Sequence, residues 1–420
     1  MTSKPHHDEA YVWVWLPGAT EPVVAGRLVR DGENLIFNYG SSYLALEGAI
    51  PLYLPELPLR AGAIAPESGL NMAGCLRDGA PDAWGRRVIL NRAFGIKGKD
   101  ADIGAIDELT FLLESGSDRI GALDFQLSPA TYVPRSTKAA SLEELLTAAE
   151  RVEKGIALTP ELDQALFHGS SLGGARPKAM VEDGDKKFIA KFSSSSDTYN
   201  VVKAEFIAMS LAAKAGLNVA PVRLAHVAGK DVLLVERFDR LHTNDGWQRK
   251  AMVSALTIFG LDEMMARYAS YDHLTEVIRH RFSQPKDTLR ELFGRLVLNI
   301  LCGNTDDHAR NHAAFWDGKM LHLTPAYDIC PQSRTGNEAS QAMLIIGSNR
   351  RSTLATCLEA APNFLLDKKT AAGIIQHMLA TVRTEWKATC DDASLSDVDR
   401  NLFWERIFLN PYIFEGNEGL

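Results

Sequence analysis

The chain has 420 residues, of which 46% are hydrophobic and 23% charged, and its formal net charge is −8. This length and apolar content allow two or three domains with sizeable cores, while the acidic balance argues against a protein that binds DNA or RNA on its own. The five cysteines are scattered without C-x-x-C spacing, which argues against a disulfide framework or a zinc module and favours reduced thiols.

Signals for export or membrane insertion do not stand out in this sequence. The first ten residues, MTSKPHHDEA, contain no apolar segment of the kind found in signal peptides. No uncharged apolar run approaches the roughly 18 residues that a membrane-spanning helix needs. We therefore expect a cytoplasmic protein without membrane contact.

The first part of the chain is predicted to be β-rich. Short apolar and aromatic strings between residues 11 and 65 are separated by Pro17-Gly18 and Asp31-Gly32, a pattern typical of a small antiparallel sheet. Around residues 74–85 the pattern becomes helical. The charged residues in and after this region are interpreted as a surface ion-pair group: Asp78, Asp82, Arg86 and Arg87.

A loop rich in small residues follows a predicted helix. Ser141-Leu-Glu-Glu144 is a capping box that opens this helix, and Gly155 can close it. The stretch 170–178, SSLGGARPK, combines glycines that allow close backbone approach with successive N–H groups that can bind an anion. It lacks the Gly-Lys-Ser/Thr of a Walker A motif, so a plain linker is the alternative.

A lysine and a glutamate are predicted to pair beyond this loop. Lys191 lies in the apolar string 188–192, where an unpaired lysine is costly to bury. Residues 200–216 are predicted to form a helix whose apolar stripe is bordered by Glu205. Pairing with Glu205 would hold Lys191 against nucleotide phosphates, as in protein kinases. Alternatively, Lys191 extends to solvent.

The remainder of the chain is predicted to be mostly helical. Two strand-like strings, 222–227 and 232–235, precede it. A second capping box, Thr288-Leu-Arg-Glu291, predicts the start of a helix, and helical patterns recur at 369–386 and 395–409. The order of patterns predicts three consecutive parts: a β-rich subdomain (1–130), a part with strands and the Gly-rich loop (131–238) and a helical body (239–420).

The polar loop 304–311, NTDDHARN, holds the strongest candidate chemistry. In kinase-type enzymes an Asp accepts the proton of the substrate hydroxyl, and an Asn five residues later binds magnesium. Asp306 and Asn311 have this spacing and Asp307 does not, so Asp306 is the preferred base. His308 and His312 lie four residues apart but lack the Glu of a zinc metalloprotease motif, which favours hydrogen bonding for both.

A further aspartate is expected to return to this loop. Apolar strings at 313–316 and 320–323 flank Asp317-Gly318-Lys319, which predicts a hairpin. The hairpin would bring Asp328 back as a second magnesium ligand, while a turn residue after Pro325 is the alternative. Gly-rich loop, strand lysine, helix glutamate, Asp-x-x-x-x-Asn loop, hairpin and aspartate follow one another in the linear order of a protein-kinase-like fold.

These strings resemble the HipA-type toxins, the serine/threonine kinase half of a bacterial toxin–antitoxin pair. The similarity covers nearly the whole chain and rests, beside the β-rich front, on SSLGGARPK (170–178), FIAK (188–191), AEF (204–206), GLNVAP (216–221), VERFDR (235–240), GNTDDHARN (303–311) and PAYD (325–328). It implies an α+β fold: a two-lobed, protein-kinase-like structure with a β-rich N-terminal subdomain and a mostly helical C-terminal lobe.

The resemblance also implies roles for single residues, with ATP and Mg²⁺ as cofactors. Asp306 would be the catalytic base, and Asn311 and Asp328 the magnesium ligands. Nucleotide contacts would come from the Gly-rich loop, the Lys191–Glu205 pair, the hinge that reads adenine and the catalytic loop: Leu172, Gly173, Gly174, Ala175, Arg176, Lys178, Lys191, Glu205, Glu236, Arg237, Phe238, His308 and Asn311. Arg176-Pro177 departs from the Gln-Glu sequence of some family members.

Regulation and partners are implied in the same way. Ser171, with Ser170 as the alternative, would be autophosphorylated, and its phosphate would eject the loop and silence the enzyme. Family members arrest growth by phosphorylating a translation component such as an aminoacyl-tRNA synthetase, and a small helix-turn-helix antitoxin (HipB-like) holds them. We expect contact with operator DNA mainly through that antitoxin. A catalytically silent corepressor and a small-molecule kinase are the competing hypotheses.

Overall fold

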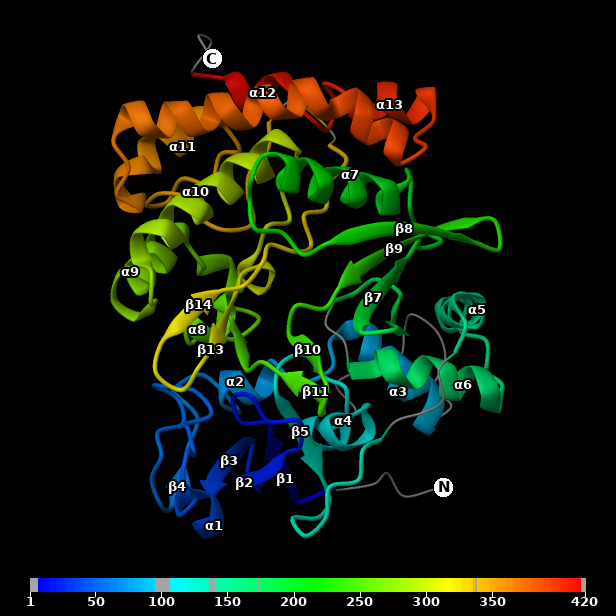
Figure 1. Cartoon of the computed structure of the whole chain (residues 1–420), viewed down its shortest axis with the longest axis vertical. Coiled ribbons are helices and arrows are strands. Elements are labelled where there is room, and N and C mark those ends of the chain that lie inside the picture. The colour runs from blue at the N-terminus through cyan, green and yellow to red at the C-terminus, as the bar shows by residue number, and fades with distance from the viewer. Residues whose placement is uncertain are drawn as a thin grey trace. The chain divides into compact units, whose positions relative to one another are not determined.

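The computed structural model describes residues 7–94, 106–135, 140–171, 174–334, 336 and 338–416. The chain has a mixed α+β fold, as the sequence predicts (Figure 1). It divides into two compact units. The first unit consists of residues 1–196, 225–253 and 315–319, and the second of residues 197–224, 254–314 and 320–420. Each unit takes chain from several places, so the division into three consecutive parts stays a prediction.

The first unit contains two principal sheets with short helices. Its strands are β1 (Glu9–Val14), β2 (Val23–Asp31), β3 (Asn34–Tyr39), β4 (Ala63–Ile64), β5 (Leu123–Gln126), β6 (Lys178–Asp183), β7 (Lys186–Phe192), β8 (Val222–Val227), β9 (Lys230–Glu236), β10 (Arg240–Thr243), β11 (Gly246–Arg249) and β12 (Met252–Ser254). Of these, β8 begins and β12 ends in residues that belong to the second unit. Its helices are α1 (Ser41–Leu44), α2 (Gly74–Arg77), α3 (Ala83–Phe94), α4 (Glu108–Glu114), α5 (Leu142–Glu153), α6 (Pro160–Phe167) and the 3₁₀ turn η2 (His168–Ser171).

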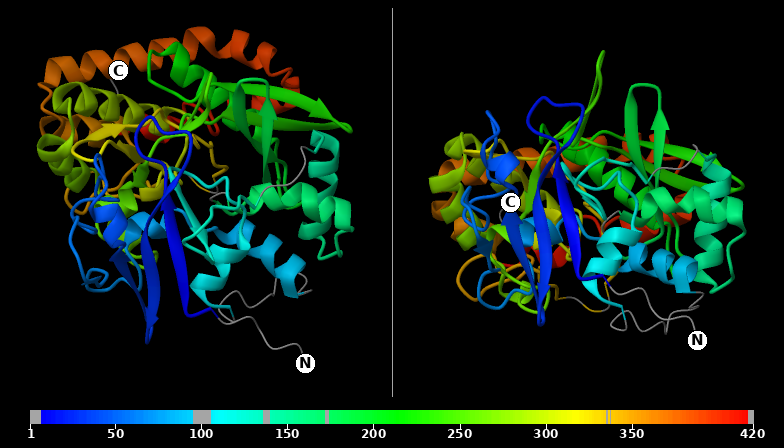
Figure 2. Two further views of the ribbon diagram at one scale, coloured as in Figure 1. Left: turned by 60° about the horizontal axis from the view of Figure 1, so that its bottom comes forward. Right: turned by 90° about the horizontal axis from the view of Figure 1, so that it is seen from below.

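The N-terminal sheet has the strand order β4-β3-β2-β1-β5 (Figure 2, blue to cyan). Each neighbouring pair in this order is antiparallel. Alternate residues of β3, namely Leu35, Phe37 and Tyr39, are buried, as expected for a strand with one face on a core. The small antiparallel sheet predicted for residues 11–65 is therefore confirmed.

The second sheet has the order β6-β7-β9-β8, and helices α3, α5 and α6 share a hydrophobic core with it. Trp84 of α3 is completely buried in this core beside Leu145 and Leu146 of α5. Helix α5 begins with the predicted capping box, in which the Ser141 side chain accepts from the Glu144 backbone and the Glu144 side chain accepts from the Ser141 backbone.

The second unit is mainly helical. Its elements are α7 (Val201–Lys214), α8 (Ala255–Ile258), η3 (Ala266–Tyr268), α9 (Tyr271–Arg281), α10 (Pro285–Leu301), η4 (Ala309–Asn311), β13 (Ala313–Trp316), β14 (Leu321–Leu323), α11 (Leu354–Ala360), η5 (Ala361–Phe364), α12 (Lys368–Asp392), α13 (Asp397–Phe403) and η6 (Pro411–Phe414). Within this unit α12 packs against both α7 and α10 (Figure 1). The hairpin predicted around Asp317-Gly318-Lys319 is present as β13 and β14.

Two predicted helix boundaries in this unit are wrong. Helix α10 starts at Pro285, not at the Thr288 capping box, because a proline at the first helical position loses no hydrogen bond and has a suitable φ. In the predicted helix 395–409 only Asp397–Phe403 is helical, since the positive φ angles of Glu405 (58°) and Leu409 (52°) interrupt it. Along the described part of the chain, no helix combines the length and apolarity needed to span a membrane.

Candidate functional site

The polar loop 304–311 leaves the end of α10 through a glycine. Gly303 has φ +70°, and a Cβ placed on it would lie 2.6 Å from the carbonyl oxygen of Ile407. The next residue is tied back to the helix, because the Asn304 backbone N–H donates to the Asn299 carbonyl (2.8 Å) and the Asn304 side-chain amide donates to Asn299 Oδ1 (3.0 Å). The loop therefore starts from a fixed point.

Asp307 has a structural role within this loop. Its side chain is only 2% exposed, its carboxylate lies 2.9 Å from His312 Nε2, and it accepts a hydrogen bond from the Tyr271 hydroxyl. Burial alone would raise the pKa of this carboxyl, but the His312 and Tyr271 contacts outweigh burial and lower it. Asp307 thus fixes the loop to α9 and to the residue before β13.

Asp306 differs from its neighbour, since it is exposed. Partial desolvation raises the pKa of its carboxyl, His308 opposes the shift, and the carboxylates of Asp328 and Asp307 add to it. The backbone carbonyl of Asp306 accepts the side-chain amide N–H of Asn311 (3.2 Å). This bond orients Asn311 and leaves its carboxamide oxygen as the atom that can coordinate a cation.

Asp328 returns to the loop along the segment after β14. The Tyr327 hydroxyl donates to the Arg310 carbonyl (2.7 Å), and the Ala326 N–H donates to the Asn218 carbonyl (2.8 Å). Asp328 itself has φ +58°, a left-handed conformation that non-glycine residues adopt rarely and often at functional sites. The electrostatic influence of Asp328 on Asp306 places the two carboxylates in each other's field.

The donors in this site suit a hard divalent cation. Asn311 and Asp328 offer an amide oxygen and a carboxylate, and magnesium prefers oxygen ligands supplied by one or two side chains, water and phosphates. No group of three His, Cys, Asp or Glu side chains that could hold a metal occurs among the described residues. Nearby, Nδ1 of His308 is buried without a hydrogen-bond partner, which is an orphaned polar atom beside the candidate base.

The Gly-rich loop belongs to the first unit and is anchored by the start of α3. The Gly174 N–H donates to the Asp82 carboxylate (2.6 Å), and the Trp84 N–H donates to the Gly174 carbonyl (3.2 Å). The Trp84 indole donates to the Lys178 carbonyl (2.9 Å). Asp82 is thus a loop anchor, which the interpretation as a surface ion-pair group misses. Among the predicted loop residues, Ala175 is exposed and Arg176 half-buried, while Leu172 and Gly173 lie outside the described residues.

The two candidate phosphorylation serines are buried in η2. Ser170 is 0% exposed, and its hydroxyl accepts the Gly116 N–H (3.2 Å). Ser171 is 2% exposed and donates to the Asp118 carbonyl (3.3 Å). A phosphate on either hydroxyl does not fit this packing, so phosphorylation requires the turn to leave residues 116–118.

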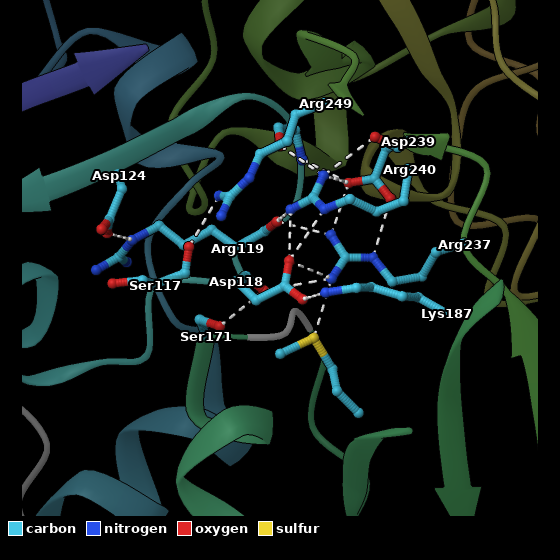
Figure 3. A network of polar contacts seen from close by, with 12 residues as sticks. Ser117, Asp118, Arg119, Asp124, Ser171, Lys187, Arg237, Asp239, Arg240 and Arg249 are labelled. Atoms are coloured by element: carbon cyan, nitrogen blue, oxygen red, sulfur yellow. Dashed lines mark hydrogen bonds and ion pairs between the residues drawn. The ribbon is translucent and has the colours of Figure 1, made fainter. Parts of the chain in front are cut away.

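The predicted hinge, residues 236–238, begins at the last residue of β9. Glu236 accepts from Lys186 Nζ (2.6 Å), and the ring of Phe238 lies edge-on to Phe315 at 5.9 Å. The Arg237 side chain is 1% exposed and bonded to Asp118 and Asp239 (Figure 3), so its guanidinium is occupied within the protein. Any nucleotide contact of Arg237 would have to come from its backbone.

The buried polar cluster around Arg237 was not predicted from the sequence. The alternating charges of VERFDR directly after a buried strand were the available signal, because charges are buried only with partners. Lys191 is half-buried and Glu205 is 3% exposed. The first belongs to one unit and the second to the other, so their pairing stays a prediction.

Comparisons with known protein families cover an N-terminal and a C-terminal stretch of the chain. Residues 14–126 match the model of the HipA N-terminal domain, and residues 170–386 match the model of the HipA-like C-terminal domain. The protein named "Putative kinase Y4mE" from Sinorhizobium fredii is 25% identical over 340 residues, which is 75% of this chain and 76% of that relative. The serine/threonine-protein kinase toxin HipA of Shewanella oneidensis is 27% identical over 184 residues, 38% of this chain and 42% of that protein.

A solved structure has the same fold over most of its length. It is a chain from the complex of HipA, HipB and operator DNA of Shewanella oneidensis MR-1, and it superposes with a TM-score of 0.67 at 19% identity. The superposition covers 93% of each chain.

Proposed function

We propose that this chain, which belongs to the HipA family, transfers the γ-phosphate of ATP to a serine or threonine hydroxyl of a protein, with Asp306 as the catalytic base. The observation that carries the proposal is the difference in environment between two adjacent aspartates of the 304–311 loop. Asp307 is buried and bonded to Tyr271 and His312, whereas Asp306 is exposed in the field of Asp328. Only Asp306 has the five-residue spacing to Asn311.

Each residue of the loop has a chemical task in this proposal. Asp306 orients the substrate hydroxyl and accepts its proton, and its raised pKa makes the carboxylate a somewhat stronger base. Asn311, oriented by its bond to the Asp306 carbonyl, and Asp328 would hold magnesium. The bound cation would neutralise charge on the phosphates during transfer.

The nucleotide would be bound by residues that the sequence singles out in the first unit and in α7. Lys191, supported by Glu205, and Lys178 would contact phosphates, together with N–H groups of the Gly-rich loop. The adenine would be read by the backbone of residues 236–238. The burial of Ser170 and Ser171 supports a regulatory site, because phosphorylation there would have to displace the Gly-rich loop.

The proposed cellular role is that of a cytoplasmic toxin. The solved relative comes from a complex with HipB and operator DNA, which supports a HipB-like antitoxin and operator DNA as partners of this chain. The substrate would be a translation protein, for example an aminoacyl-tRNA synthetase. Growth arrest would follow from its phosphorylation.

Controlled expression in bacteria, combined with ATP calorimetry on the purified chain, tests this role. The wild type should arrest growth and bind Mg-ATP, whereas Asp306→Asn should bind Mg-ATP and permit growth. A chain that binds no nucleotide but increases operator affinity of an antitoxin would instead be a silent corepressor. Turnover of a sugar or aminoglycoside without growth arrest would identify a small-molecule kinase.

A further inference from the structure

A buried ionic network in the first unit surrounds the end of β9 (Figure 3). At its centre, Oδ1 of Asp118 accepts from Arg237 Nη1 (3.0 Å) and Arg240 Nη2 (2.8 Å), and its Oδ2 accepts from Lys187 Nζ (2.8 Å). The side chains of Arg237 and Arg240 are both 1% exposed. Asp118 therefore joins strand β7 to both arginines of the VERFDR string.

A second aspartate closes the network from the other side. Asp239 accepts from Arg237 Nη2 (2.8 Å), from Arg240 Nη1 (2.9 Å) and from the backbone N–H of Gly121 (2.8 Å). The Arg119 carbonyl in turn accepts hydrogen bonds from both arginines. The segment 116–121 and the string 236–240 are thus bonded to each other through side chains and backbone at several points.

The stability of this network depends on the negative charge of Asp118. Burial alone would raise the pKa of the Asp118 carboxyl, but Arg237, Arg240 and Lys187 hold it well below its usual range. Removing this carboxylate would leave Arg237, Arg240, Lys187 and Arg249 near one another with fewer acids to neutralise them, and buried like charges repel strongly.

The same segment also touches the serine turn η2. The Ser171 hydroxyl donates to the Asp118 carbonyl (3.3 Å), and Gly116 N–H donates to Ser170 (3.2 Å). Gly85 of α3 packs tightly on the Ser170 carbonyl, where a Cβ would lie 2.1 Å away. Residues 116–118 therefore contact the serine turn on one side and Arg237 and Arg240 on the other.

We propose that Asp118 is a positioning residue that holds the hinge string 236–240 in the conformation needed for nucleotide binding and couples it to the serine turn η2. The proposal rests on the proposed role of residues 236–238 in reading adenine. Asp118 itself touches no nucleotide. When Ser171 leaves its place beside Asp118, the hinge string loosens and nucleotide affinity falls.

The first experiment compares Asp118→Asn with Asp124→Asn in the full chain. Asp118→Asn keeps the side-chain shape but removes the charge. It should weaken Mg-ATP binding by about tenfold to 100-fold, the size of effect expected when hydrogen bonds to a charged group that hold the binding conformation are lost. The KM for ATP should rise while kcat at saturating ATP changes less. Asp118→Glu should recover part of the affinity.

Asp124→Asn is the matched control. It breaks the Arg119–Asp124 pair, whose side chains are both 0% exposed, and the second arginine that pairs with Asp124 is Arg135. This variant should lower the melting temperature and leave the ATP affinity within roughly twofold, because Asp124 pairs with the Arg119 side chain, whereas Arg237 and Arg240 bond to the Arg119 backbone carbonyl. Equal losses of ATP affinity in both variants, or no loss in Asp118→Asn, would overturn the positioning role.

One further variant and the wild type cover the remaining outcomes. If Asp118→Asn fails to fold, Lys187→Gln removes a partner at the edge of the network, where the lysine is 17% exposed, and should still weaken ATP binding. Unchanged affinity in Lys187→Gln would then reject the proposal. A wild type that binds no ATP would reject the hinge assignment itself, and this proposal with it.

The coupling to the serine turn has its own readout. Ser171→Glu adds charge and bulk at the buried hydroxyl and should strongly speed hydrogen exchange at the amides of residues 236–240. Ser171→Ala only removes the hydrogen bond to Asp118 and should speed this exchange much less. Exchange rates that are the same in both variants would contradict the coupling.

Discussion

Adjacent aspartates in the 304–311 loop have opposite environments. Asp307 is buried and its carboxyl pKa is lowered by His312 and Tyr271, while Asp306 is exposed and its pKa is raised by desolvation and nearby carboxylates. Two groups whose environments move their pKa values apart usually have different roles. Here one aspartate holds the loop, and the other faces outward with its carboxylate available for proton transfer.

Exchange of each aspartate for asparagine should separate these roles. Asp307→Asn removes a buried charge from His312 and Tyr271 and should lower the free energy of unfolding by about 2 kcal/mol, as for loss of hydrogen bonds to a charged group. Asp306→Asn should leave it nearly unchanged, because this side chain is exposed. Urea denaturation measures both, and equal destabilisation would argue against the assigned roles.

Asn311 should affect the magnesium requirement. Its amide nitrogen already bonds to the Asp306 carbonyl, so its carboxamide oxygen is the available ligand. We expect Asn311→Ala to raise the magnesium concentration for half-maximal phosphoryl transfer by roughly tenfold, in the range found when support of a metal site is lost. A magnesium titration at saturating ATP checks this, and an unchanged midpoint would remove Asn311 from the metal site.

The spacing of these residues was readable because it is local. Asp306 and Asn311 lie in one loop, and Asp328 follows one hairpin later, so short-range patterns were enough to single them out as candidates. The Asp118 network could not be read in this way, because Asp118 and Arg237 are 119 residues apart. No periodic pattern in a single sequence reports a contact over that distance.

At the level of elements, the conformation of the 304–311 loop depends on how α10 ends. Helix α10 runs to Leu301, and Gly303 then turns the chain with φ +70° directly against the Ile407 carbonyl. A residue with a side chain at this point meets both backbone strain and a steric clash.

Gly303→Ala should therefore destabilise the chain by about 2 kcal/mol or more and reduce phosphoryl transfer. Gly347 is a suitable control, since it has φ +53° with nothing within 4 Å of an added Cβ. Gly347→Ala should cost only the conformational strain, about 1 kcal/mol. Chemical denaturation of both variants tests the difference, and equal losses would show that contact with Ile407 is unimportant.

Prediction of the elements succeeded where local chemistry dominates. The Ser141–Glu144 capping box and the Asp317–Lys319 hairpin both gave correct boundaries, because each forms its own hydrogen bonds or turn. The Thr288 box failed since Pro285 competes for the helix start and α10 is held by its buried face. Tertiary packing outweighed the cap there.

For the whole molecule, the buried network of the first unit predicts how the protein responds to acid. The pKa of Asp239 is lowered to about 2, with burial opposing the shift and Arg237 and Arg240 causing it. An unfolded aspartate titrates at roughly 3.9. Because the folded pKa is the lower one, the stabilisation is complete above about pH 4 and is lost as pH falls towards about 2.

The free energy of unfolding should thus decline steeply between about pH 4 and 2, as measured by urea denaturation at a series of pH values. Asp239→Asn should be less stable at pH 7 and show a shallower decline over the acid range. A decline of the same steepness in wild type and Asp239→Asn would mean that other carboxylates control acid unfolding.

The organisation of the whole chain could be predicted only in part. The change from β-rich to helical sequence correctly indicated an α+β fold, because secondary-structure periodicity is local. The sequence could not predict which segments make up each unit, because residues 225–253 and 315–319 belong to the first unit although the chain has already entered the second before them. Such returns depend on long-range packing.

Transfer of the γ-phosphate of labelled ATP to the chain itself tests the central claim most directly. With magnesium present, the wild type should acquire label on the peptide that contains Ser170 and Ser171, and Asp306→Asn should remain unlabelled while keeping its fold. Equal labelling of both proteins, or no label in either, would contradict the assignment of Asp306 as the base of a protein kinase.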